Sequence, residues 1–280
     1  MRTQLALVIL LGTGTVGAAE GPEASFWRQW GDGQAEIASY DLTIPRYAKP
    51  RSGTAVAIFV TEPFSTTRRV KADLPGADVV PVIKLNLVKD YQTGIYDYNE
   101  MTSAFVSLKS FEPLKVSFSR QEWCGHVFRQ LLFDPGFLRA DYHSYFEGEG
   151  DEQKQMLRPE NTLSEDTLLL WARGMVSPRL KEGEAAPVAF LTSLAGRAAY
   201  VPATAERKGD RRTVTVGAAY KVTLTVEPSG EGRVLGWEVS NGEKAVLIKS
   251  ARMKYWQLNS PEGLSELTRL GLKVRPPRTM

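Results

Sequence analysis

The stretch from Lys84 to His126 alternates between the two faces of an extended chain, and this pattern constrains the fold more than any other feature. Leu85 and Leu87 fall on one side of a pleat, and the same period of two returns in residues 102–107 and 115–121. A period of two that continues through consecutive segments is typical of a β-sheet. The sequence therefore predicts three or four adjoining antiparallel strands in this region.

Turn residues mark where these strands end. We expect the central strands to turn at Gly94 and at Asn99. Further along the chain, the Asn-Gly dipeptide at 241–242 predicts a two-residue hairpin loop, because both residues tolerate the positive φ angles of a type I′ turn. That loop length places Trp237 opposite Val246, which is an aromatic to β-branched pair of the kind that stabilises sheets.

Two stretches carry helix signals. Thr162 and Glu165 have the spacing of a capping box, which predicts a helix that ends near Gly174. Ser260 is an N-cap residue followed by a proline, and Gly271 is suited to the C-terminal cap. The sequence therefore predicts a mainly β protein, a large curved antiparallel sheet or an open or half barrel, with two or three short helices.

The first 19 residues have the pattern of a secretory signal peptide. Arg2 supplies a positive charge, residues 5–11 form a short apolar run, and small residues at 16–19 suit a signal peptidase. The run is shorter than the roughly 20 apolar residues that span a bilayer, and we expect no transmembrane segment elsewhere. The predicted location is periplasmic or secreted, after cleavage near residue 18–19.

The remaining chain has the length of one large sheet domain. We expect residues 20–280 to form a single β-rich domain, and two lobes with a seam near 178–187 are the alternative. Cys124 is the single cysteine of the sequence, so no disulfide can form within the chain. Burial and strand pairing must therefore supply the stability.

The charges of the chain nearly cancel. The 35 basic and 32 acidic residues argue against nucleic acid as a partner. Basic side chains do gather at 68–71 and 207–212, and we interpret both clusters as solvated turns. A patch for an anionic ligand or a lipid headgroup is the alternative.

One group of residues invites a catalytic interpretation. A histidine close to a cysteine can lower the pKa of the thiol, as His126 could do for Cys124. Asp141 and His143 would complete a conceivable zinc set. We favour a buried, structural Cys124 and no metal, because a lone cysteine is among the most buried residue types. The sequence contains no hydrolase elbow, zincin motif or P-loop, and it predicts no cofactor.

The leading hypothesis is an exported, non-catalytic envelope protein. Its curved sheet would bind a lipid-like or other apolar ligand, or an envelope protein, on the concave face. The predicted lining residues are Tyr96, Phe105, Phe118 and Trp123. The alternative is a hydrolase or a metal-dependent enzyme that uses Cys124, His126 and His143.

Several segments resemble a family of uncharacterised secreted bacterial proteins of about this size. The segments that carry the resemblance are AEIASYDL, AVAIFVTEPF, VIKLNLVKDYQTGIYDYNEMTSAF, KVSFSRQEWCGHVF and SARMKYWQ, and the resemblance covers most of the mature chain. Some members of that family carry the label of the Maf septum-formation inhibitors. The S-x-S-P-R-R-like start of Maf nucleotide pyrophosphatases is absent here, so we do not expect that activity. In fold, the predicted meander resembles the periplasmic half-barrels related to LolA-type lipoprotein carriers.

Overall fold

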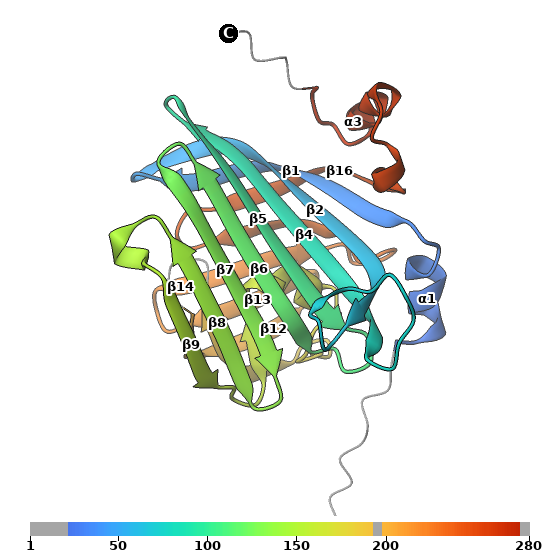
Figure 1. The fold of residues 1–280 in the computed structure, drawn as a ribbon, viewed down its shortest axis with the longest axis vertical. Coiled ribbons are helices and arrows are strands. Elements are labelled where there is room, and N and C mark those ends of the chain that lie inside the picture. Colours follow the sequence, from blue (N-terminus) through green and yellow to red (C-terminus); the bar gives the residue numbers. More distant parts are fainter. Residues whose placement is uncertain (1–21, 193–197, 275–280) are drawn as a thin grey trace, which may run out of the picture.

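One sheet of 16 strands forms the body of the molecule (Figure 1). The computed structural model describes residues 22–192 and 198–274. The first nine strands are β1 (Ala35–Arg46), β2 (Lys49–Ser65), β3 (Val70–Lys71), β4 (Val79–Thr93), β5 (Tyr96–Ser107), β6 (Pro113–Glu122), β7 (Gly125–Asp134), β8 (Phe137–Ser144) and β9 (Glu152–Leu157). The others are β10 (Thr162–Ser164), β11 (Ala185–Thr192), β12 (Ala199–Lys208), β13 (Arg211–Val216), β14 (Tyr220–Val226), β15 (Val234–Val239) and β16 (Lys244–Met253).

Short helices accompany the sheet. The α-helices are α1 (Ala24–Trp30), α2 (Leu168–Ala172) and α3 (Glu266–Arg269). The 3₁₀-helices are η1 (Glu147–Glu149), η2 (Glu165–Thr167), η3 (Tyr255–Gln257) and η4 (Pro261–Ser265). No helix within 22–192 or 198–274 combines the length and the apolar character needed to cross a membrane. The predicted signal peptide, residues 1–19, lies outside the described residues.

The strands form two meanders, β1–β9 and β10–β16, which are joined by the ladder between β1 and β16. The order is β10-β11-β12-β13-β14-β15-β16-β1-β2-β4-β5-β6-β7-β8-β9, and β3 pairs with β2 at the side. The predicted mainly β fold with a large curved sheet is thereby confirmed. One detail of the prediction is wrong, because β10 runs parallel to β11 while the other described ladders are antiparallel.

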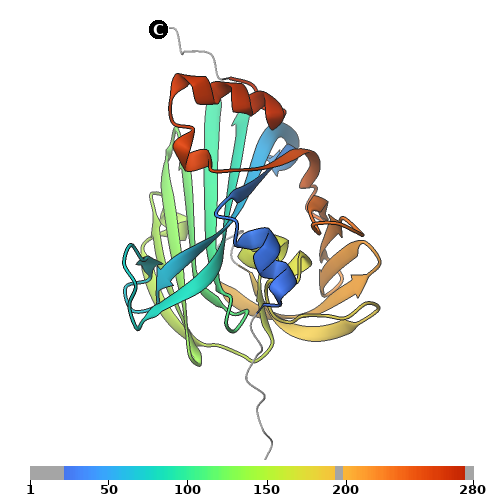
Figure 2. The same ribbon diagram turned by 90° about the vertical axis from the view of Figure 1, so that its right-hand side faces the viewer.

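The sheet curls around its own core (Figure 2). Alternate residues such as Tyr40 and Leu85 are fully buried on its concave side, where α2 contributes Leu170 and Trp171 to the same cluster. Helix α1 covers one end of this side, where Trp30 is 1% exposed and packs against Phe59. The concave face therefore holds the main hydrophobic core, and α2 is enclosed by strands of both meanders.

A buried ion pair crosses this core. Arg173, just after α2, binds both carboxylate oxygens of Glu36 on β1, at 2.8 and 2.9 Å. Both side chains are 1% exposed. The guanidinium lies over the rings of Trp30 and Phe59, at 5.0 and 4.6 Å from their centroids. The pair fixes α2 against the first strand of the sheet.

The convex face carries a smaller cluster. Ile37, Met253 and Leu270 are buried together there. The hydroxyl of Ser39 on β1 donates a hydrogen bond to the backbone carbonyl of Leu270, next to α3. The predicted C-terminal helix is present as η4 followed by α3, and it covers β16, β1 and β2 from outside.

The predicted helix that starts at Thr162 is wrong in its first turn. Residues 162–164 form β10, and the Thr162 hydroxyl donates to the carbonyl of Pro159 at 2.7 Å instead of capping a helix. Pairing with β11 satisfies this backbone, so the α-helix begins only at Leu168.

Of the two turns predicted in the central strands, the one at Asn99 is wrong. Asn99 lies within β5 and pairs with Asp90, whereas Gly94 does form the expected turn, with φ +61°.

The hairpin between β15 and β16 has a register that differs by one residue from the prediction. Trp237 lies opposite Ala245, not Val246. The loop has three residues, because Val239 donates its N–H to the carbonyl of Glu243 at 2.8 Å and Gly242 takes φ +100°. Trp237 and Ala245 consequently face the core, while Val246 is 50% exposed.

Residues 178–187 lead from α2 into β11, which belongs to the same sheet as the strands before it. The structure thus describes a continuous sheet on both sides of the expected seam. The division of the chain into domains stays a prediction.

Candidate ligand-binding site

A cavity of about 230 Å³ opens on the concave face between the two meanders. Strands β1, β4, β5 and β6 form one side, β14 and β15 with the β15–β16 loop form the other, and η2 and α2 lie between them. Its apolar lining residues are Ile44, Pro45, Leu87, Phe118, Leu168, Leu169, Val222, Leu224, Trp237 and Val239. Its polar lining residues are Arg46, Lys89, Tyr91, Glu100, Thr102, Arg120, Glu165, Asp166, Tyr220, Asn241 and Glu243.

Lys89 on β4 is the central cation of the cavity. Its Nζ contacts Oε1 of Glu243 at 2.6 Å, and the same oxygen accepts the indole N–H of Trp237 at 2.7 Å. Burial disfavours the charged ammonium, but the carboxylates of Glu243, Glu100 and Glu165 outweigh that effect and raise the pKa of Lys89. Lys89 therefore stays protonated at neutral pH.

Two tyrosines donate to the other carboxylates. The Tyr91 hydroxyl donates to Glu100 at 3.0 Å, and the Tyr220 hydroxyl donates to Glu165. Burial, reinforced by the adjacent carboxylate, raises the pKa of each phenol. Both hydroxyl groups are thus neutral hydrogen-bond donors at physiological pH.

Arginines complete the polar part of the site. Arg129 contacts Asp166 at 2.8 Å in a buried pair, and its guanidinium lies 5.0 Å from the ring centroid of Phe118. Glu122, with a side chain 2% exposed, lies 3.6 Å from Arg46 and 3.5 Å from Arg120. The positive charges of the cavity are therefore matched by carboxylates of the protein itself.

The predicted aromatic lining residues are only partly brought together. Phe118 lines the cavity and is 7% exposed. Phe105 lies on the convex face instead, 5.1 Å from Phe64 and under the ammonium of Lys84, because neighbouring residues of β5 alternate between faces. Tyr96, the first residue of β5, and Trp123, in the turn between β6 and β7, contact each other edge to face and do not line the cavity. Trp123 is 58% exposed.

The residues of the catalytic alternative lie away from this cavity. The prediction of a buried Cys124 is wrong, since this residue is exposed in the turn between β6 and β7. His126 and His143 are also exposed, and His143 stacks on Phe128 and faces Asp151 at 3.5 Å. Within residues 22–192 and 198–274, no three His, Cys, Asp or Glu residues are grouped so that they could hold a metal. Asp141 lies on β8 opposite Gln130 and is not part of such a group.

Sequence reasoning did not single out the charged residues of the cavity. Lys89 continues the series of Leu85 and Leu87 on the concave side of β4. A lysine at a position where the strand pattern predicts an apolar residue is the one local sign of a buried polar site. Glu243 lies 154 residues further along the chain. No local pattern connects the two.

Comparison with known proteins gives similarities of fold alone. No family model matches the chain, and no curated protein matches it significantly. It is similar to a beta-barrel-like protein of the domain of unknown function DUF1849 from Brucella abortus, with 11% identity, a TM-score of 0.46, and coverage of 79% of this chain and 98% of that chain. It is also similar to a DUF1089 family protein from Pseudomonas aeruginosa, with 13% identity, a TM-score of 0.37, and coverage of 54% and 82%. The expected likeness to LolA-type half-barrels stays a prediction.

Proposed function

We propose that this protein is an exported, non-catalytic binding protein that holds an amphipathic, lipid-like ligand on the concave face of its sheet. The cavity between the two meanders carries the proposal, because it combines ten apolar side chains with fixed hydrogen-bonding groups. Its volume, about 230 Å³, suits one part of a larger ligand, such as an acyl chain with the adjoining polar group.

The ion pairs at the cavity indicate the charge of the ligand. Lys89 is paired with Glu243, and Arg129 with Asp166. A strongly charged ligand would have to break these pairs, which costs several kcal/mol for buried charges. A ligand that is neutral where it enters the cavity leaves the pairs intact.

Three polar groups of the cavity keep their protons at neutral pH. A general acid or base works best when its pKa lies near the working pH. The pKa values of Lys89, Tyr91 and Tyr220 are all raised from ordinary values that are already above neutrality. These groups hold their protons and act as a fixed polar lining.

Native mass spectrometry of the protein purified from the envelope of its own cell tests the proposal. We expect a mass excess that disappears on denaturation and is identified as lipid, on a chain that has lost about 19 residues. A bare chain would reject the ligand and favour the other partner predicted from sequence, an envelope protein. A full-length mass would reject export with cleavage.

Two phenylalanines provide a matched pair of variants. Phe118→Ala removes an apolar wall of the cavity, whereas Phe105→Ala removes the same group from the convex face. Each truncation is expected to reduce stability, by about 3–5 kcal/mol for a fully buried ring and less for a partly exposed one. Only Phe118→Ala should lose the bound lipid in the native spectrum. Equal retention or equal loss in the two variants would contradict the placement of the ligand.

A further inference from the structure

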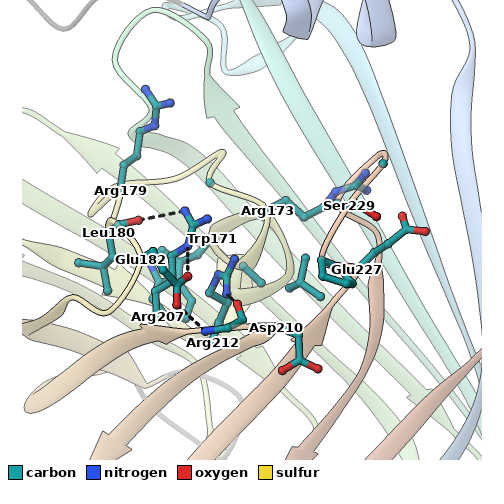
Figure 3. A pocket seen from close by; sticks show the side chains of 17 residues that line it. Trp171, Arg173, Arg179, Leu180, Glu182, Arg207, Asp210, Arg212, Glu227 and Ser229 are labelled. Atoms are coloured by element: carbon teal, nitrogen blue, oxygen red, sulfur yellow. Dashed lines mark hydrogen bonds and ion pairs between the residues drawn. The ribbon is translucent and has the colours of Figure 1, made fainter.

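A second, larger hollow lies outside the site described above. It encloses about 420 Å³ between the end of α2, residues 179–182, the turn from β12 to β13 and the loop from β14 to β15 (Figure 3). This volume is within the usual range of small-molecule sites. The basic cluster at 207–212 forms one wall of it. The cluster is a turn between β12 and β13, as expected, with residues 208–211 exposed and Arg207 and Arg212 half-buried against the hollow.

Arg207 and Arg212 occupy directly opposite positions on β12 and β13. Figure 3 shows both guanidinium groups turned into the hollow, with Asp210 turned away from them. The next pair of the hairpin, Lys208 and Arg211, is fully on the exposed side. The hairpin therefore separates two basic pairs, one directed inward and one directed to solvent.

The inward pair is held by backbone carbonyls and by one carboxylate, that of Glu182. Arg207 donates to the carbonyl of Leu180 at 3.2 Å, and Arg212 donates to the carbonyls of Gly209 and Arg211, both at 2.9 Å. Glu182 is the nearby acid, 3.5 Å from Nε of Arg207. These contacts fix the position of each guanidinium and use only part of its five N–H donors.

The two charges repel each other. Burial together with the positive charge of Arg207 lowers the pKa of Arg212. Like charges at directly opposite positions of a β-ladder are destabilising. The carboxylates of Glu182 and Asp210 act in the opposite direction, but the pKa of Arg212 is lowered all the same. Of the other charged groups at the hollow, Arg173 is paired with Glu36 and Glu227 with Arg233.

We propose that this hollow binds the phosphate group of a small phosphorylated ligand. Two adjacent guanidinium forks suit the oxygens of a phosphate, and its charge of about −1.5 to −2 relieves their repulsion. Arg179 lines the entrance and is exposed, with its guanidinium over Phe111 at 4.5 Å. Trp171 and Val226 supply an apolar wall for the rest of the ligand. The site is separate from the concave cavity and does not depend on the function proposed for it.

Calorimetric titration and thermal unfolding test this proposal with three probes: inorganic phosphate, glycerol 3-phosphate and a soluble short-chain phosphatidic acid. Sodium chloride keeps the ionic strength constant, because exposed charges are screened by salt. We expect saturable binding of at least one probe and a rise in the unfolding temperature with its concentration. Preference for inorganic phosphate, for the ester or for the lipid identifies the source of the phosphate group.

Two double variants with the same loss of charge separate the site from a general basic surface. Arg207→Gln/Arg212→Gln should weaken binding by about tenfold or more, because the charge-assisted hydrogen bonds to the phosphate are lost. Lys208→Gln/Arg211→Gln should bind as the parent does.

Either of two results would overturn the proposal. One is that no probe binds saturably to the parent protein at constant ionic strength. The other is that both double variants lose binding equally, which would indicate non-specific attraction to the positive surface.

Discussion

Arg173 shows how a single side chain can join distant parts of this core. Its guanidinium combines a bidentate bond to Glu36 with the faces of Trp30 and Phe59. A lysine at this position would supply only a point charge, without the planar fork that both contacts require. The pair satisfies two buried charges that would otherwise be costly in the interior.

We predict that Arg173→Leu lowers the free energy of unfolding by about 3–5 kcal/mol, because it leaves the Glu36 carboxylate buried without its partner. Arg233→Leu is the matched control, since its side chain is 36% exposed and pairs with Glu227 near the surface. Such an exposed pair contributes only about 0–1 kcal/mol. Urea unfolding followed by tryptophan fluorescence measures both values. An equal loss of unfolding free energy in the two variants would show that the buried pair of Arg173 contributes no more to stability than the exposed pair of Arg233.

At the scale of secondary-structure elements, the hairpin of β15 and β16 depends on close contact between backbones. A Cβ atom added to Gly236 would lie 2.4 Å from the carbonyl oxygen of Ala245, which is too short for any side chain. Trp237 follows Gly236 on β15, and its indole N–H donates to Glu243, the residue before β16, at 2.7 Å. The close approach of β15 and β16 therefore helps to position Trp237 and Glu243, which line the concave cavity.

We predict that Gly236→Ala lowers the free energy of unfolding by about 1–3 kcal/mol, the usual range for overpacking. Gly148→Ala serves as the control, because a Cβ atom at Gly148 would meet no atom within 4 Å. Chemical denaturation gives both values. An unchanged stability of Gly236→Ala would contradict the tight approach of the two strands.

Most strands of this fold could be predicted from sequence, whereas their partners could not. Alternation along 84–126 reflects the pleat of each strand and is a local property. The three-residue loop at 240–242 sets a register in which Trp237 and Ala245 are both buried. Whether these side chains are buried depends on the rest of the folded core and cannot be seen in the local sequence. For the same reason β10 was expected as a helix start, since its backbone is satisfied by β11 more than 20 residues later.

Prediction of the cavity from sequence was limited in the same way. The sequence predicts both Phe118 and Phe105 as lining residues, because aromatic residues commonly line ligand sites. The local pattern of β5 does not say which face is concave, and Phe105 lies on the convex one. Lys89 and Glu243 come from different meanders, and only the curvature of the sheet brings them into contact.

At the scale of the whole molecule, many buried groups hold their protons more tightly in the folded state than in the unfolded chain. Burial is the main cause for Tyr98 and Tyr200, whose pKa values are raised to about 12. The pKa of Lys89 is also raised. Each of these shifts favours the protonated group in the folded protein, so all of them stabilise the fold below the pKa of the unfolded chain.

We therefore predict that stability is constant through neutral pH and falls as the pH rises above about 10, where the unfolded chain begins to lose these protons first. Urea midpoints measured between about pH 8 and pH 12 show this loss. Tyr200→Phe removes one contributing phenol and should make the decline with pH shallower. A midpoint that stays constant up to about pH 12 would contradict the tight retention of protons.

The pairing of β1 with β16 has a consequence for the order in which the molecule can form. Residues 39 and 249, which lie in this ladder, are 210 positions apart, whereas the hairpins of each meander join neighbouring segments. Contacts between distant segments form late, because the entropy of closing a long loop must be overcome first. Each meander can assemble from its own hairpins, but the ladder that unites them must wait until residue 253 has left the ribosome. A chain interrupted before Lys244 would leave the edge of β1 open to pairing with other molecules.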